Sequence, residues 1–120
     1  MAAILIIDDD PDALAILETF LEAQGHTAHV ARTGEEGLSI LDRVRPAVVI
    51  VDVMMPEMDG WEVVRRIRDR PGLDRTRILM LTARDDRRSR QQAHDAGVDA
   101  YLVKPLSLEA LSTRIEQSLP

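Results

Sequence analysis

Cysteine is missing from this chain of 120 residues, which excludes both a disulfide framework and a zinc site built on thiolates. Basic residues are also scarce, since Lys and Arg number 15 against 21 acidic residues and leave a net charge of −6. A nucleic-acid-binding domain usually has the opposite balance, so we expect no direct contact with nucleic acid. Arginines within residues 65–70 and 84–90 are interpreted as solvated helix faces, with a protein-contacting surface as the alternative.

Long hydrophobic runs are absent as well. The first apolar segment is interrupted by Asp8, Asp9 and Asp10, and the other apolar segments are too short to cross a bilayer. No signal-peptide pattern is present, so we expect a cytoplasmic protein without a membrane segment. The length is that of one ordinary domain, and residues 1–120 are therefore predicted to form a single domain.

Lysine is almost missing, because Lys104 is the only one and every other fixed cation is an arginine. A compact ammonium holds its ligands differently from a planar guanidinium. In a chain that otherwise uses arginine, the single lysine indicates a specific task for Lys104.

Short apolar runs alternate with segments of helical period along the whole chain. The predicted strands are residues 2–7, 27–30, 47–51, 78–81 and 100–103, and a predicted helix follows each one. The helices begin near Asp10, Gly34, Gly60, Asp85 and Ser107. Strands that alternate with helices in this way predict an α/β fold: a doubly wound, five-stranded parallel sheet of (βα)5 type.

Polar side chains follow the predicted strands at their carboxyl ends, where ligands bind in such sheets. They are Asp8 and Asp9 after the first strand, Asp52 after the third, Thr82 and Ala83 after the fourth, and Lys104 after the fifth. Three carboxylates cannot all stay ionised at close range without a cation. Oxygen ligands without His or Cys favour a hard ion, Mg²⁺ first and Mn²⁺ as a possible substitute. An ion beside a lysine and a hydroxyl forms a phosphate-binding site, in which the Asp52 carboxylate is the natural nucleophile.

These residues lie in stretches that resemble the receiver domain of bacterial two-component response regulators. The stretches are IIDDDP at 6–11, VDVMMPEMDG at 51–60, LTA at 81–83 and YLVKP at 101–105. The resemblance extends from the first predicted strand to the last helix. It implies the flavodoxin/CheY-like fold, with strand order 2-1-3-4-5.

The resemblance also implies a role for each site residue. Asp52 would accept a phosphoryl group from a phosphohistidine on a sensor histidine kinase or a phosphotransfer protein. Asp9, Asp52 and the backbone carbonyl of Met54 would bind Mg²⁺, with Asp8 acting through a water molecule. The phosphoryl oxygens would be bound by the Thr82 hydroxyl, the Ala83 amide and the Lys104 ammonium.

A conformational switch is implied in the same way. Thr82 would move toward the phosphoryl group and Tyr101 into the space behind it, which would repack the face of the fourth helix, fifth strand and fifth helix. The Lys104–Pro105 peptide bond is predicted to be cis. Met54 and Arg84 are predicted to tune self-dephosphorylation, because both should flank the path of the attacking water.

The phosphodonor is expected to contact the first helix, through Ala13, Leu14 and Leu17, together with the Pro105–Leu106 loop. No enzymatic activity is expected beyond self-phosphorylation from small donors and self-dephosphorylation. We expect a monomer, or a weak dimer when phosphorylated. The sequence leaves open whether the domain acts alone or belongs to a longer regulator, and it does not reveal the signal or the output.

Other functions remain as alternatives. A degenerate receiver would serve only as a constitutive docking module. A magnesium-dependent phosphatase of the haloacid dehalogenase type needs a second acid two residues after the nucleophile, where Met54 stands. A flavin or nucleotide module would need a loop rich in Gly, Ser or Thr after the first strand, where the chain has Asp-Asp-Asp-Pro.

Overall fold

The structure is a computed structural model that describes residues 2–53, 59–83 and 87–119. Within these ranges strands and helices alternate as β1 (Ala3–Ile7), α1 (Pro11–Ala23), β2 (Thr27–Ala31), α2 (Gly34–Val44), β3 (Val48–Asp52), α3 (Gly60–Arg68), β4 (Arg77–Thr82), α4 (Arg87–Ala96), β5 (Ala100–Val103) and α5 (Leu108–Ser118). The strands form one parallel sheet in the order β2-β1-β3-β4-β5. The predicted fold class and strand order are confirmed.

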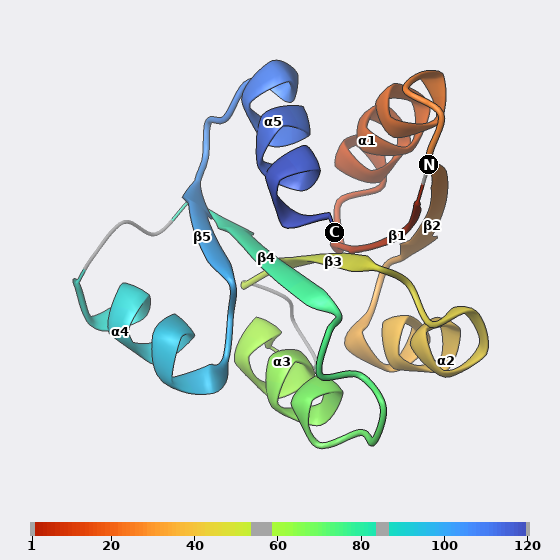
Figure 1. Cartoon of the computed structure of the whole chain (residues 1–120). Helices are drawn as coiled ribbons and strands as arrows, with labels where there is room; N and C mark the ends of the chain where they lie inside the picture. Colours follow the sequence, from red (N-terminus) through yellow and green to blue (C-terminus); the bar gives the residue numbers. More distant parts are fainter. Residues whose placement is uncertain (1, 54–58, 84–86, 120) are drawn as a thin grey trace.

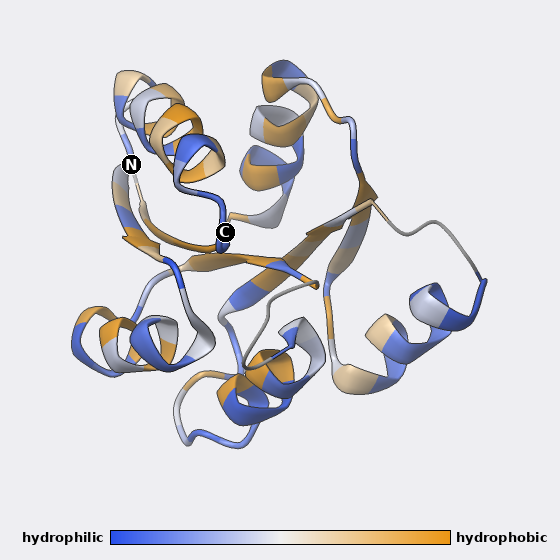
Figure 2. Cartoon of the chain, turned by 180° about the vertical axis from the view of Figure 1, so that it is seen from behind, coloured by the Kyte–Doolittle hydropathy of each residue, from blue (hydrophilic) through white to orange (hydrophobic). Residues whose placement is uncertain are grey.

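Helices cover both faces of the sheet, with α1 and α5 on one face and α2, α3 and α4 on the other (Figure 1). Side chains of β1 alternate between the two layers: Leu5 and Ile7 pack toward α2 and α3, whereas Ile4 and Ile6 pack toward α1 and α5. Figure 2 shows the result as hydrophobic strands between helices whose polar faces turn outward. Among the described residues, no helix is both long enough and apolar enough to cross a membrane.

Local sequence signals explain where several helices begin. The Asp10 carboxylate accepts a hydrogen bond from the Asp12 N–H at 3.0 Å, and Pro11 opens α1 with an amide that has no hydrogen to donate. The Ser107 hydroxyl caps α5 by accepting a hydrogen bond from the Ala110 N–H at 3.0 Å. Asp85, predicted to cap the fourth helix, lies outside the described residues.

Arg68 differs from the solvated helix arginine that its sequence context predicted. Its side chain is only 22 % exposed and lies under the amino-terminal ends of β4 and β5. Its guanidinium donates hydrogen bonds of 2.8–3.3 Å to the carbonyls of Leu73, Thr76 and Gly97 and to the Asp99 carboxylate. We call this group, with Arg77 on the other Asp99 oxygen, the Arg68–Asp99 network.

Candidate functional site

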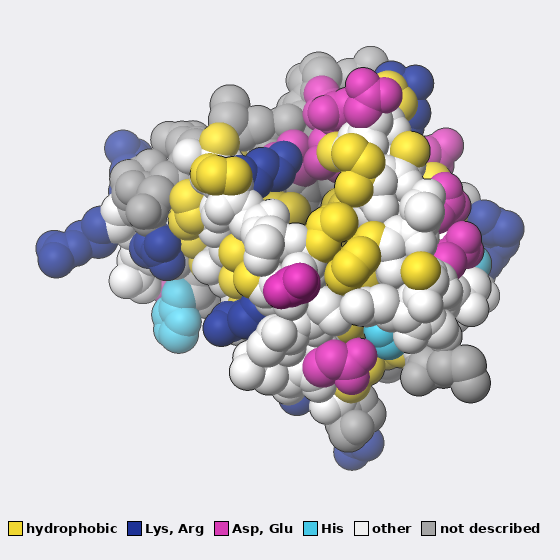
Figure 3. Space-filling model, turned by 90° about the horizontal axis from the view of Figure 1, so that it is seen from above, with side chains coloured by type: hydrophobic (Ala, Val, Ile, Leu, Met, Phe, Trp, Pro, Cys, Tyr) yellow, Lys and Arg dark blue, Asp and Glu magenta, His cyan; other side chains and the backbone are white. Residues whose placement is uncertain are grey.

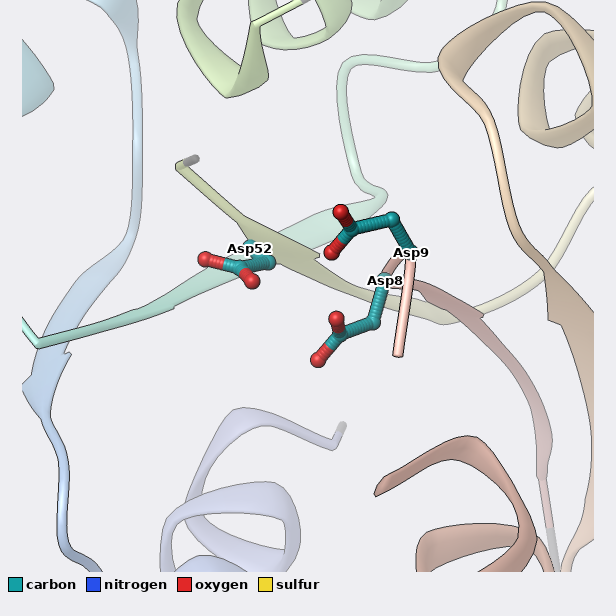
Figure 4. Close-up of side chains that lie close together, drawn as sticks. All are labelled: Asp8, Asp9 and Asp52. Atoms are coloured by element: carbon teal, nitrogen blue, oxygen red, sulfur yellow. The ribbon is translucent and has the colours of Figure 1, made fainter. Parts of the chain in front are cut away.

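Three carboxylates meet at the carboxyl edge of the sheet. Asp8 and Asp9 directly follow β1, and Asp52 is the last residue of β3. Because Ile7 is in register with Val51, the ends of these two central strands lie beside each other. One oxygen from each of the three side chains lies within 4.8 Å of the others (Figure 4). The structure thus brings together the acids that strand-end positions had selected.

Lys104 reaches the same cluster from the end of β5. Its Nζ lies 3.6 Å from Asp52 Oδ2 and 3.7 Å from Asp8 Oδ2. Its backbone N–H donates to the Thr82 carbonyl at 2.7 Å, which joins the ends of β4 and β5. One ammonium therefore faces three carboxylates, and the excess of negative charge is of the kind that a bound cation offsets.

Asp8 is the most deeply buried member of the cluster, with a side chain 6 % exposed. Burial raises the pKa of Asp8 above its ordinary value and the negative charge of Asp52 raises it further, whereas a hydrogen bond from the Asp10 N–H and the Lys104 charge lower it. A hard divalent ion would favour the charged form of such a carboxyl group. With oxygen donors alone, the site fits Mg²⁺ and, by the same chemistry, Mn²⁺.

Backbone contacts fix where these carboxylates stand. The Asp8 N–H continues the ladder beyond β1 by donating to the Ala31 carbonyl at 3.0 Å, and Asp8 Oδ1 accepts from the Asp10 N–H at 3.0 Å. The turn that starts α1 therefore also holds the Asp8 carboxylate. One short segment, Asp8–Asp10, supplies two of the three carboxylates of the site and the helix cap.

Gly60 is a site-supporting residue that strand-end reasoning did not select. Its N–H donates to the Val53 carbonyl at 2.9 Å, so that α3 begins directly behind the end of β3. A Cβ at this position would lie 2.7 Å from the Asp52 carbonyl oxygen, closer than real Cβ atoms approach. The sequence signal was the final glycine of VDVMMPEMDG, whose role becomes visible only with the backbone of Asp52 in place.

The remaining predicted site residues lie along β4 and β5. Thr82 ends β4 and is fully buried, and Ala83 follows it in an exposed position. Asp52 is in register with Leu81, which places Thr82 one position farther toward the edge. Tyr101 is half-buried in β5.

The Lys104–Pro105 peptide bond is cis. Met54 and Arg84, the predicted tuning residues, lie outside the described residues.

The predicted phosphodonor contacts on α1 require a correction. Leu14 and Leu17 are 4 % and 7 % exposed and pack against the sheet, because the helical period turns them toward α5 and the core. The large apolar side chain that α1 does expose is Ile16, at 57 %. Of the three residues predicted on α1, Leu14 and Leu17 are therefore not available on the surface, whereas Ala13 is half-buried.

Comparison with known families identifies the chain. The family model described as the response regulator receiver domain matches residues 4–116. This chain belongs to the receiver-domain family. Receiver domains are parts of two-component response regulators, and magnesium-dependent phosphorylation is a general feature of the family. The match favours a receiver over the magnesium phosphatase and the flavin module considered above.

Individual relatives agree with this assignment. The chain is 40 % identical over 119 residues to the transcriptional regulatory protein AfsQ1 of Streptomyces coelicolor, covering 99 % of this chain and 52 % of that protein. It is 39 % identical to an uncharacterized 14.6 kDa protein of Leptolyngbya boryana, covering 95 % and 87 %. The solved structure of CheY4 from Vibrio cholerae superposes with a TM-score of 0.95 at 32 % identity, covering 99 % of each chain. The chain spans about half the length of AfsQ1 and of several other curated relatives.

Proposed function

We propose that this receiver domain is switched by phosphorylation of Asp52, and that the 120 residues form one phosphoacceptor domain. The observation that carries the proposal is the convergence of Asp8, Asp9 and Asp52 within 4.8 Å, with the only lysine 3.6 Å from Asp52. A purely structural cluster would gain nothing from placing three acids around one ammonium. The donor is the phosphohistidine of a sensor histidine kinase or of a phosphotransfer protein.

Asp52 acts as the nucleophile. A carboxylate oxygen forms a bond to phosphorus while the bond between phosphorus and the donor's imidazole nitrogen breaks, and the imidazole leaves with the electron pair. Lys104, already held between Asp8 and Asp52, offsets the negative charge of the incoming phosphoryl oxygens. The Thr82 hydroxyl and the Ala83 amide donate to the same oxygens.

Asp8, Asp9, Asp52 and the carbonyl of Met54 would hold the metal ion, with Asp8 acting through water. When bound, Mg²⁺ neutralises charge on the transferring group and orients it for in-line attack. Mn²⁺, which accepts the same oxygen ligands, would substitute.

Phosphorylation is read out through Thr82 and Tyr101. Thr82 moves toward the phosphoryl group, Tyr101 moves inward, and the face formed by α4, β5 and α5 changes. Such a switch needs a local charge change and an element with two arrangements. Met54 and Arg84 set the rate of self-dephosphorylation.

The phosphodonor docks beside the acidic cluster, on the exposed part of α1 and on the loop after β5. Hydrophobic side chains gather over α1 in the view of Figure 3, and Ile16, which is 57 % exposed, is the large apolar side chain that α1 exposes. Leu106, in the loop after the cis bond, is half-buried. These residues give the donor an apolar surface next to the nucleophile.

The protein acts in the cytoplasm as a monomer or a weak phosphorylation-dependent dimer, with no direct contact to nucleic acid or membrane. Its catalysis is limited to self-phosphorylation from small donors and self-dephosphorylation. AfsQ1 is named a transcriptional regulatory protein and is about twice as long, so the output belongs to a partner or to another part of a longer chain.

Intact mass after incubation with acetyl phosphate tests this proposal. We expect one added phosphoryl group in the wild type with Mg²⁺, and none without Mg²⁺ or in Asp52→Asn. Asp42→Asn, which changes an exposed carboxylate outside the cluster, is the matched control and should gain the group normally. An unmodified wild type whose buried Trp61 fluorescence also ignores Mg²⁺ and beryllofluoride would support a constitutive docking module instead.

A further inference from the structure

Arg90 of α4 lies over the ring of Tyr101 of β5. The guanidinium carbon is 5.1 Å from the ring centroid, within the range of a cation–π interaction. Arg90 is exposed, whereas Tyr101 is half-buried and packs against the core layer shared by α2, α3 and α4. The contact therefore bridges a surface helix and the edge strand of the sheet.

This contact matters because α4 buries only small side chains against the sheet. Its sequence, RRSRQQAHDA, offers only Ala93 and Ala96 as apolar side chains, and the residues it buries are Ser89 and Ala93. By contrast, α3 buries Trp61, Val63, Val64 and Ile67 along with its first glycine. Small buried groups give α4 a smaller apolar attachment than that of α3, and the Arg90 contact adds a cation–π interaction to it.

Tyr101 lies in the strand that connects the Arg90 contact with the acidic cluster. In β5 it is in register with Met80 of β4, and β5 is the last strand of the sheet on this side. Two residues farther along, Val103 is in register with Thr82, and Lys104 follows with its Nζ 3.6 Å from Asp52. The same short strand thus links the Arg90 contact to the acidic cluster.

We propose that Arg90 is a positioning residue of the switch, which holds the Tyr101 ring in its half-buried place and couples it to α4. The inference rests on the proposed function, because it concerns the movement of Tyr101 that accompanies phosphorylation. Movement of the ring inward breaks its cation–π contact with Arg90. Arg90 therefore stabilises the arrangement described here against the inward one, and it makes α4 respond when the ring moves.

Linkage gives this role a measurable consequence. A ligand that favours the inward arrangement must overcome whatever stabilises the other one. Removing the cation–π contact should therefore tighten the binding of a phosphoryl analogue at Asp52. A partly exposed cation–π contact corresponds to a change of about two- to fivefold in the equilibrium.

The chain offers a direct probe, since Tyr101 is its only tyrosine. Protein labelled with 3-fluorotyrosine gives one ¹⁹F resonance, which is followed during titration with beryllofluoride at saturating Mg²⁺. In Arg90→Ala we expect the free-state resonance to shift toward its saturated position and the half-saturating concentration to fall about two- to fivefold. Arg90→Lys, which keeps the charge without the planar stack, should lie between Arg90→Ala and wild type.

Arg88→Ala is the matched control, because it removes the same charge from an exposed position of α4 and should titrate like wild type. Wild-type behaviour of Arg90→Ala, or weaker binding of beryllofluoride by that variant, would overturn the role of Arg90. An equal change in Arg88→Ala would do the same, since it would assign the effect to net charge. If the wild-type resonance ignores beryllofluoride altogether, the phosphorylation proposal itself fails, which is a separate outcome.

Discussion

The two ends of the sheet use charge in opposite ways. At the amino-terminal end, the Arg68–Asp99 network matches its groups at hydrogen-bonding distance: Asp99 Oδ2 accepts from Arg68 at 2.8 Å and from the Ile78 N–H at 2.8 Å. At the carboxyl end, three acids face one ammonium, whose Nζ is 3.6–3.7 Å from its nearest carboxylates. Charge at the first end holds the fold, whereas charge at the second end binds a metal ion and a phosphoryl group under the function proposed above. The difference teaches that burial of ionic groups alone does not mark a functional site.

The largest effect on stability should come from removing the Arg68–Asp99 network at the amino-terminal end of the sheet. Arg68→Ala removes the guanidinium donors from the carbonyls of Thr76 and Gly97. It also leaves the Asp99 carboxylate with only part of its hydrogen bonding, so the free energy of unfolding should fall by roughly 2–4 kcal/mol. Urea denaturation measures the loss. Arg65→Ala, an exposed change on the same helix, should stay within about 0.5 kcal/mol of wild type.

If the two ends are as separate as their contacts indicate, folded Arg68→Ala protein at low temperature should still gain one phosphoryl group from acetyl phosphate. A stability loss below about 1 kcal/mol would mean that water replaces the guanidinium without penalty.

The next largest effect should come from the support behind Asp52. In Gly60→Ala, the new Cβ would crowd the Asp52 carbonyl at 2.7 Å, and we expect a loss of roughly 1–3 kcal/mol together with slower phosphorylation. Ser39→Ala is the control, because it removes a hydroxyl from an exposed position of α2 and introduces no new atom. Urea unfolding and the rate of mass gain test both variants. Equal stability and equal phosphorylation rates of the two variants would show that the backbone at the start of α3 can shift to accommodate the new Cβ.

A smaller effect of opposite sign should follow from Asp8→Asn. Because the folded pKa of Asp8 is raised, its ionised form opposes folding: stability is highest below the ordinary pKa of 3.8 and falls as the pH rises through the raised value. In metal-free buffer at a pH above the raised pKa, Asn should therefore raise the free energy of unfolding.

Magnesium should make the wild type more stable than Asp8→Asn, because the ion binds the wild type more tightly and so stabilises it more. Thermal unfolding without Mg²⁺ measures the gain in stability of Asp8→Asn, and thermal unfolding with Mg²⁺ measures how much the ion stabilises each protein. Asp10→Asn, which keeps a capping side chain outside the acid cluster, should show neither the gain nor the loss of magnesium response. A destabilised Asp8→Asn in metal-free buffer would contradict the view that this carboxylate is held for a cation.

The smallest effect belongs to an ion pair outside both ends of the sheet. Arg70 donates two hydrogen bonds to the Asp42 carboxylate, at 2.6 and 3.2 Å. This hydrogen bonding is the main cause of the lowered pKa of Asp42. Its contribution is present above pH 3.8 and is lost as the pH falls through the lowered pKa. Because Asp42 is 54 % exposed, a double-mutant cycle with Asp42→Asn and Arg70→Gln should give less than about 1 kcal/mol, decreasing with salt. A salt-independent coupling would indicate a desolvated pair.

The sequence predicted the acidic end of the sheet far better than the amino-terminal end. Strand ends are visible from hydrophobic runs, and parallel order brings Asp8, Asp9 and Asp52 to one edge, so their approach could be expected. Arg68 was misjudged because its acceptors are loop carbonyls that the sequence does not mark, including one 29 positions away at Gly97. Every residue has a backbone carbonyl, so carbonyl acceptors leave no pattern in the sequence. An arginine that donates to them cannot be distinguished by sequence from a solvent-exposed arginine.

Two other differences have physical reasons of the same kind. Leu14 and Leu17, which the resemblance assigned to a docking surface, are buried against the sheet, whereas Ile16 is the large apolar side chain that α1 exposes. Gly60 acts by the absence of a side chain, which becomes meaningful only beside the Asp52 carbonyl. The roles of Met54 and Arg84 stay predictions.

The strand order has a consequence for how the protein matures. The acidic cluster is gathered from the ends of β1 and β3, and its ammonium comes from the end of β5, so the cluster draws on residues 8, 52 and 104. No short stretch of chain contains it, and a nascent chain that lacks β5 lacks the lysine. Such long-range pairing forms late in folding. The protein can therefore accept a phosphoryl group only once the sheet is complete. A misfolded or truncated copy would not respond to the phosphodonor.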